Sequence, residues 1–142
     1  MEARVVEKLD TKLEDAWPVF ADFKGLSDML PPGATMEIDG EGVGAIRTVT
    51  TPDGGTVKER LEALDHDNNQ FSYAVINDDS PLPFTDYLAT VKLRETSPTS
   101  CEVDWSSNFQ SAGAMAEADL TKMIEGMYRG VIRQLATKCP AA

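Results

Sequence analysis

Between residues 35 and 110, apolar side chains recur at every second position along successive short runs, and this alternation constrains the fold more than any other feature. Side chains two residues apart lie on one face of a β-strand, so the pattern predicts a sheet with one covered face and one solvent-facing face. Turn-forming segments such as Pro52-Asp53-Gly54-Gly55 and Ser80-Pro81-Leu82-Pro83-Phe84 separate the runs, which favours antiparallel connections. Together with a β-prone run near the N-terminus, they predict a seven-stranded antiparallel sheet. The expected strands cover 3–10, 35–40, 43–51, 56–65, 70–77, 86–96 and 101–110.

The odd-numbered positions of these strands are expected to form the covered face. Only Arg47 and Glu59 bring charge to that face, and they stand six residues on either side of Asp53. A hairpin centred on Asp53 places them opposite one another, where they neutralise each other. Such a pair either fixes the register alone or also offers donors and acceptors to a bound molecule, and both readings stay open. The inward set is Val43, Ala45, Arg47, Val49, Val57, Glu59, Leu61, Ala63, Phe71, Tyr73, Val75, Tyr87, Ala89, Val91, Leu93, Cys101, Val103, Trp105, Ser107 and Phe109.

Two short helices are expected between the first and second strands. Thr11 begins a Thr-x-x-Glu capping box, which predicts a helix over 12–22. Pro18 lies inside this helix and removes one of its hydrogen bonds. The second short helix is expected over 24–30 and ends where two prolines and a glycine follow. The apolar stripe of the first helix is Leu13, Ala16, Trp17, Phe20 and Phe23.

The C-terminal segment 114–138 is expected to form the longest helix, because its apolar residues recur at helical spacing for more than four turns. Its face with Met123, Met127 and Val131 is predicted to pack across the concave side of the sheet, with Glu117 and Glu125 pointing outward. No repeat or linker interrupts the order of elements, so we expect one α+β domain over 1–142.

The charge balance argues against several classes of partner. The 24 acidic and 13 basic residues give a net charge of -11, which repels a nucleic-acid backbone. The N-terminus has no continuous apolar stretch of the kind found in secretory signals, and no run is long enough to span a bilayer. We expect an acidic cytoplasmic protein with no nucleic-acid partner and no membrane insertion, as a monomer or homodimer.

Metal and disulfide chemistry are not expected either. The two cysteines, Cys101 and Cys139, are too few for a disulfide framework and lack the spacing of a zinc site. The single histidine, His66, lies in a turn and is expected to be solvated. The prediction is therefore two free thiols, no bound metal and no cofactor.

Several segments resemble the helix-grip proteins often called SRPBCC, which include the birch pollen allergen, START lipid-transfer domains and bacterial polyketide cyclase/dehydrase-like proteins. The order of elements is similar over essentially the whole chain. The resemblance implies a helix-grip fold, in which a curved sheet surrounds a long C-terminal helix. The matching segments are Ala16-Trp-Pro-Val-Phe-Ala-Asp-Phe23, Gly40-x-Gly-x-Gly-Ala-x-Arg47, Glu59-Arg-Leu-Glu62, Leu64-Asp65 and Tyr87.

A fold of this kind predicts an internal cavity between the sheet and the C-terminal helix, and the preferred function is binding of a small, largely apolar molecule that is lipid-, polyketide- or aromatic-like. Aromatic and methionine side chains of this sort also fill ordinary cores, and only the resemblance favours a cavity lining over an ordinary core. The expected lining is Trp17, Phe20, Arg47, Glu59, Tyr73, Tyr87, Trp105, Phe109, Met123, Met127 and Tyr128.

Two other functions remain open. One is a polyketide cyclase or dehydratase, a lyase without metal or nucleotide cofactor, in which Glu59 acts as general base and Arg47 steadies an enolate. The other is a protein-interaction module, as in chaperone-stimulating relatives of the superfamily. Catalysis is ranked below binding because the expected cavity offers only one titratable acid beside an always-charged arginine.

Particular members of the superfamily match less well. Plant abscisic-acid receptors are similar in placing an arginine and a glutamate at the positions of Arg47 and Glu59, but their gate and latch motifs are replaced here. Norcoclaurine synthase-like members use a lysine in the cavity, whereas Lys122 is expected to flank the inner face of the long helix. The glycine run Gly40, Gly42 and Gly44 joins two strands, so turn geometry explains it better than phosphate binding.

Overall fold

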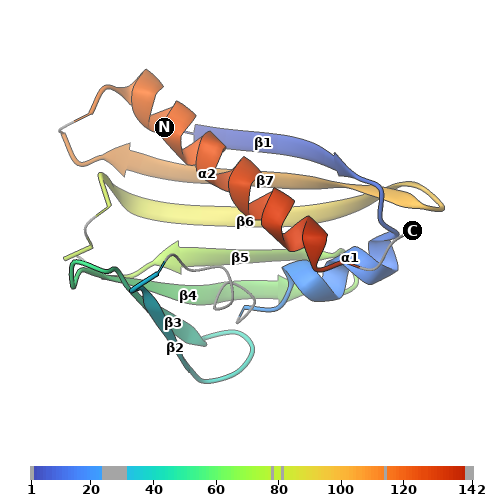
Figure 1. Ribbon diagram of the computed structural model, residues 1–142, viewed down its shortest axis with the longest axis horizontal. Helices are drawn as coiled ribbons and strands as arrows, with labels where there is room; N and C mark the ends of the chain where they lie inside the picture. The colour runs from blue at the N-terminus through green and yellow to red at the C-terminus, as the bar shows by residue number, and fades with distance from the viewer. Residues whose placement is uncertain (1, 24–31, 78, 81, 114, 140–142) are drawn as a thin grey trace.

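The computed structural model describes residues 2–23, 32–77, 79–80, 82–113 and 115–139. It contains a seven-stranded sheet in the order β1-β7-β6-β5-β4-β3-β2, with every neighbouring pair antiparallel. The first strand, β1, forms one edge of the sheet beside β7, the last strand, while the β2–β3 hairpin lies at the opposite edge (Figure 1). The strands are β1 Glu2–Leu9, β2 Thr35–Asp39, β3 Ile46–Thr50, β4 Thr56–Asp65, β5 Gln70–Val75, β6 Phe84–Ser97 and β7 Ser100–Ser111.

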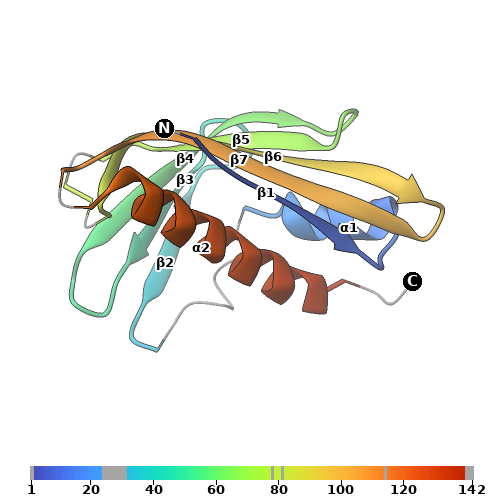
Figure 2. The same ribbon diagram turned by 90° about the horizontal axis from the view of Figure 1, so that it is seen from above.

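Both described helices, α1 (Leu13–Phe20) and α2 (Glu117–Thr137), lie on the same side of the sheet. Figure 2 shows α2 running along this side while the β2–β3 hairpin bends toward it, so the sheet curves around the helix. Burial of apolar side chains between the two layers is the main force that holds such an arrangement together. The expected architecture of a curved antiparallel sheet around a long C-terminal helix is confirmed. The second short helix, expected over 24–30, lies outside the described residues.

The strand alternation is confirmed along β7, where Cys101, Val103, Trp105, Ser107 and Phe109 are all buried. It fails in the second half of β4. The register with β5 shifts by one residue between Leu61 and Ala63, as in a β-bulge. Ala63 is therefore exposed, although it was predicted to point inward, and Leu64 packs against the core in its place.

The strand predicted over 43–51 begins later, at Ile46, and Val43 is 60% exposed instead of inward. Gly42 and Gly44 have φ angles of 66° and 94°, values that glycine adopts readily and that interrupt an extended strand. Their backbone groups instead close a turn, in which the Ala45 amide donates to the Gly42 carbonyl at 3.1 Å. This finding supports the turn interpretation of the glycine run.

Helix α1 is shorter than the expected 12–22, and its start differs from the prediction. Its N-cap is Lys12, and no side chain caps the helix, so the proposed Thr11 capping box is wrong. Thr11 is instead buried beside the end of β1. Pro18 lies inside the helix as expected, on its exposed side, and the apolar side chains of Ala16, Trp17 and Phe20 are buried.

The predicted inward face of helix α2 is confirmed only in part. Met123 and Val131 are half-buried and pack against the core, whereas Met127 is 47% exposed. Glu125 is half-buried rather than outward, and it accepts a hydrogen bond from the Arg4 amide at 3.1 Å. The apolar arc of this helix is wider than the surface that meets the sheet, so one edge of it stays open to solvent. The face that packs on the sheet is Leu120, Ile124, Tyr128, Ile132 and Leu135.

Candidate functional site

A buried ion pair lies on the concave face of the sheet. Arg47 on β3 is paired directly with Glu59 on β4, and its Nε donates to Glu59 Oε1 at 2.7 Å. Arg47 is only 5% exposed, so the guanidinium has given up almost all of its contact with water. The predicted register and the inward, opposed placement of the two charges are confirmed.

Phe23, three residues beyond α1, completes the surroundings of the guanidinium. Arg47 donates from a terminal nitrogen to the Phe23 carbonyl oxygen at 3.2 Å, and its Cζ lies 4.1 Å from the centre of the Phe23 ring. The Tyr73 ring lies on another side, at 5.1 Å. Such cation–π contacts favour a charge that is partly desolvated. Phe23 belongs to the apolar stripe found in the sequence, but was not expected among the site residues.

A chain of hydroxyl groups crosses the interior beside this ion pair. The Tyr73 hydroxyl lies 3.2 Å from that of Tyr87, and the Tyr87 hydroxyl is hydrogen-bonded to that of Tyr128. Tyr128 donates in turn to Ser107 Oγ at 2.6 Å. The four side chains come from β5, β6, α2 and β7, so the chain links the helix to the sheet. Ser107 was predicted to face inward but was not expected to belong to a site.

Burial keeps these tyrosines protonated. Loss of water raises the pKa of Tyr128 to about 12. The pKa values of Tyr73 and Tyr87 are also raised, chiefly by the same cause, and for Tyr73 the nearby Tyr128 and the Glu59 carboxylate add to the effect. At neutral pH the chain therefore presents neutral hydroxyl groups, which can donate or accept hydrogen bonds.

A spectroscopic titration is expected to report on this cluster, because Tyr73, Tyr87 and Tyr128 are the only three tyrosines of the protein. The folded protein should develop no tyrosinate absorbance through the ordinary range near pH 10, and ionisation should begin only toward pH 12. Since the folded pKa values are raised, the unfolded chain releases these protons first. Their effect on stability is therefore nil below about pH 9 and increasingly unfavourable above pH 10. A full tyrosinate signal at pH 10 in protein that circular dichroism shows to be folded would contradict the buried cluster.

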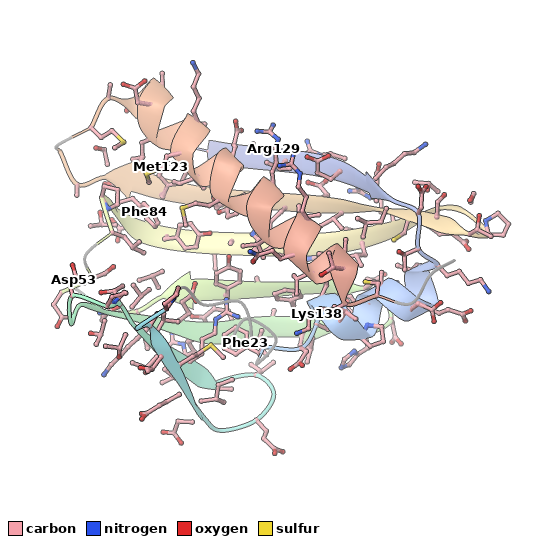
Figure 3. The ribbon with its side chains drawn as sticks, in the orientation of Figure 1. Phe23, Asp53, Phe84, Met123, Arg129 and Lys138 are labelled. Carbon is pink, nitrogen blue, oxygen red and sulfur yellow. The ribbon has the colours of Figure 1, made fainter. Side chains whose placement is uncertain are left out.

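Two hollows lie near the ion pair, and Arg47 lines the inner one. The inner hollow has a volume of about 20 Å³, which is about the room that one water molecule needs. The outer hollow has a volume of about 200 Å³ and opens between the end of α1 and the β2–β3 hairpin. Asp22 and Phe23 line both hollows, and Phe23 is labelled in Figure 3. The inner hollow is lined by Phe20, Asp22, Phe23, Arg47, Phe71, Tyr73, Trp105 and Leu135, and the outer one by Ala21, Asp22, Phe23, Ile38, Gly40, Glu41, Gly42, Ala45, Leu61 and Leu64.

The residues expected to line one cavity are therefore brought together only in part. Phe20, Arg47, Tyr73 and Trp105 line the inner hollow. Trp105 also stacks on Tyr128 at 4.9 Å between ring centres, so aromatic rings fill much of the space expected to be open. The others lie elsewhere: Phe109 contacts Phe84, Trp17 contacts Phe71 and His66, Met127 is exposed, and Met123 lies on α2 as labelled in Figure 3.

His66 forms a hydrogen bond that the sequence did not predict, whereas the two cysteines agree with the prediction. His66 was expected to be merely solvated, but although exposed it accepts a hydrogen bond at Nδ1 from the Trp17 indole at 3.0 Å. Cys101 and Cys139 carry free thiols, as expected.

Within the described ranges, no three His, Cys, Asp or Glu side chains gather in a way that could hold a metal ion. Neither of the two described helices has the length and apolar character to cross a membrane.

Comparison with known proteins shows the family. The chain matches the family described as "Polyketide cyclase / dehydrase and lipid transport" over residues 2–140, and it therefore belongs to that family. No curated protein matches the sequence. The resemblance to the SRPBCC superfamily found in the sequence is confirmed.

Solved structures show the same fold at low sequence identity. An uncharacterised protein from Bacillus thuringiensis is 24% identical with a TM-score of 0.81, and the match covers 97% of this chain and 98% of that one. The protein XoxI from Bacillus cereus is also 24% identical, with a TM-score of 0.80 and coverage of 96% and 94%. Norcoclaurine synthase from Thalictrum flavum, solved with dopamine and hydroxybenzaldehyde, is 22% identical with a TM-score of 0.71 and coverage of 97% and 84%. The fold is thus the helix-grip fold.

Proposed function

We propose that this protein binds a small, largely apolar molecule on the concave side of the sheet, next to the Arg47–Glu59 ion pair. The observation that carries this proposal is the burial of that pair, whose Arg47 lines the inner hollow, while Asp22 and Phe23 line both this hollow and the larger outer one. Burying two charges is costly and seldom adds stability over apolar side chains of similar size. A role in orienting a bound molecule gives the pair a function, and membership of a family that includes lipid transport supports it.

The size of the two hollows limits the molecule. Their volumes of about 200 and 20 Å³ fall below the roughly 300–1,000 Å³ of typical ligand pockets. Because Asp22 and Phe23 line both hollows, we propose that one molecule occupies the two together. The expected ligand is therefore compact, and we propose that it enters between α1 and the β2–β3 hairpin. Of the eleven side chains expected from the sequence, we retain Phe20, Arg47, Glu59, Tyr73 and Trp105 as candidate site residues.

The second candidate function is catalysis of a cyclisation or dehydration, with Glu59 as general base and Arg47 stabilising an enolate. One observation favours it. The Tyr73 ring lies 5.1 Å from the Arg47 Cζ, and burial raises the pKa of Tyr73, with smaller contributions from Tyr128 and the Glu59 carboxylate, so a neutral hydroxyl donor belongs to the same site. A base and a donor together meet the minimum for proton transfer.

Native mass spectrometry of protein purified from its source should reveal a retained molecule, because an apolar ligand leaves such a site slowly. Glu59→Gln then separates the two candidate functions, since glutamine keeps the shape and loses both charge and basicity. For a binding protein, affinity should change by about 5- to 150-fold in isothermal titration calorimetry, with the ligand chemically unchanged. For an enzyme, turnover should fall by about 100- to 10,000-fold with little change in binding.

Glu62→Gln is the matched control, because Glu62 lies on the same strand, pairs with Arg60 and faces outward. It should change neither affinity nor turnover. Conversion of the molecule to a product by the wild-type protein would overturn binding as the sole function. Unchanged turnover in Glu59→Gln would exclude Glu59 as the base.

A further inference from the structure

The indole of Trp105 carries a buried hydrogen-bond donor that lacks a partner. Trp105 is 5% exposed, and its Nε1 is the one buried side-chain nitrogen or oxygen among the described residues without a hydrogen bond. In the other tryptophan, Trp17, the same indole nitrogen donates a hydrogen bond to His66 Nδ1. A buried donor without a partner loses its hydrogen bond to water and gains nothing in return, so native proteins rarely leave one unpaired.

The surroundings of Trp105 indicate what could pair with it. Trp105 lines the inner hollow together with Arg47 and Tyr73, and the hollow has room for a single non-hydrogen group. Indole and guanidinium groups donate hydrogen bonds and do not accept them, so the missing group must be an acceptor. The stacked Tyr128 ring, inclined by only 14° to the indole, holds the donor in place.

The charges around the hollow favour a neutral acceptor. Glu59 already neutralises Arg47, so the ion pair offers no uncompensated positive charge to a ligand. A ligand carboxylate in the inner hollow would lose its water without gaining a counter-charge, whereas a carbonyl oxygen carries no charge to desolvate. The adjoining outer hollow has apolar walls that include Ile38, Leu61 and Leu64, and it can take the apolar body of the same molecule.

We propose that the ligand is a compact apolar compound with a neutral carbonyl group at one end. Its oxygen accepts a hydrogen bond from Trp105 Nε1 in the inner hollow, and its body passes Phe23 into the outer hollow. This inference rests on the proposed function and narrows the class of ligand to ketones, aldehydes, esters and amides.

The test compares 2-acetylnaphthalene with 2-ethylnaphthalene, which share one skeleton and differ in the carbonyl oxygen. In protein labelled with ¹⁵N at tryptophan, only Trp17 and Trp105 give indole signals. Saturating 2-acetylnaphthalene should move the Trp105 indole proton downfield and leave the Trp17 signal in place. It should also bind about 5- to 100-fold more tightly than 2-ethylnaphthalene, the factor expected when a buried donor gains its partner.

Trp105→Phe assigns the signal and removes the donor while keeping an aromatic ring against Tyr128, so the two compounds should then bind equally. Trp17→Phe is the matched control and should keep the discrimination. Equal binding of both compounds to the wild-type protein, with an unmoved Trp105 signal, would overturn this inference and leave the proposed binding function standing. Binding of neither compound would also overturn the inference, as would a Trp105 indole proton that contacts only water with and without the compounds. Native mass spectrometry would still test independently whether the protein carries another molecule.

Discussion

Glu59→Leu is expected to lower the free energy of unfolding by about 3–5 kcal/mol, because it leaves the Arg47 guanidinium buried without its counter-charge. The two side chains are only 6% and 15% exposed, so water cannot replace the lost partner. Urea unfolding followed by tryptophan fluorescence measures the change. Glu62→Leu is the matched control on the same strand, because its ion pair with Arg60 keeps more contact with water, at 45% exposure for Arg60 and 32% for Glu62. It should cost less than about 1 kcal/mol.

The double variant Arg47→Met/Glu59→Leu tests the physical reason for that loss. Removing both charges removes the uncompensated one, so the double variant should be more stable than Glu59→Leu alone. The free energies of unfolding of the wild type, Arg47→Met, Glu59→Leu and the double variant together give the coupling energy between the two side chains. Strictly additive losses would show that Arg47 and Glu59 do not depend on each other, and would contradict the buried ion pair as the anchor of the site.

The second large effect is expected in α2. Ile124→Ala should lower the free energy of unfolding by about 2–5 kcal/mol, because Ile124 is 1% exposed and its removal leaves a cavity against the sheet. Met127→Ala, one turn further along the helix, should change it by less than about 0.5 kcal/mol, because Met127 is exposed. Thermal unfolding followed by circular dichroism compares the two. Similar losses of stability in both variants would show that Met127 packs on the sheet, as the sequence predicted.

Strand positions were predicted well wherever the alternation is uninterrupted. In β7 and around the β3–β4 turn, the period of two and the turn residues specify which side chains face inward, since a slip by one residue would exchange the faces. The errors occur where the backbone departs from regular geometry. Because of the bulge in β4, Leu64 packs against the core in place of Ala63. Phe84 was predicted to lie in a connection, but it begins β6 and is buried.

The helices were less well predicted in detail, because an amphipathic pattern defines a broad apolar arc and not the line of contact. Both Met127 and Ile124 belong to the apolar arc of α2, but only Ile124 is buried. The packing angle of α2 on the curved sheet makes that choice, and it depends on the side chains of several strands at once. The Thr11 capping box also failed, because α1 begins one residue later than predicted, with Lys12 as its N-cap, and Thr11 is buried.

By itself, the sequence determined the class of fold, the covered face of most strands and the pairing of Arg47 with Glu59, because these depend on local periodicity and on one short hairpin. Only the tertiary structure decided how the aromatic side chains share the interior. Tyr73, Tyr87, Tyr128 and Ser107 come from four separate elements, and their hydroxyl chain forms only when the helix lies across the sheet. The same packing reduces the expected cavity to two small hollows and leaves Trp105 Nε1 unpaired, because side-chain packing and hydrogen-bond satisfaction depend on contacts between residues distant in the sequence.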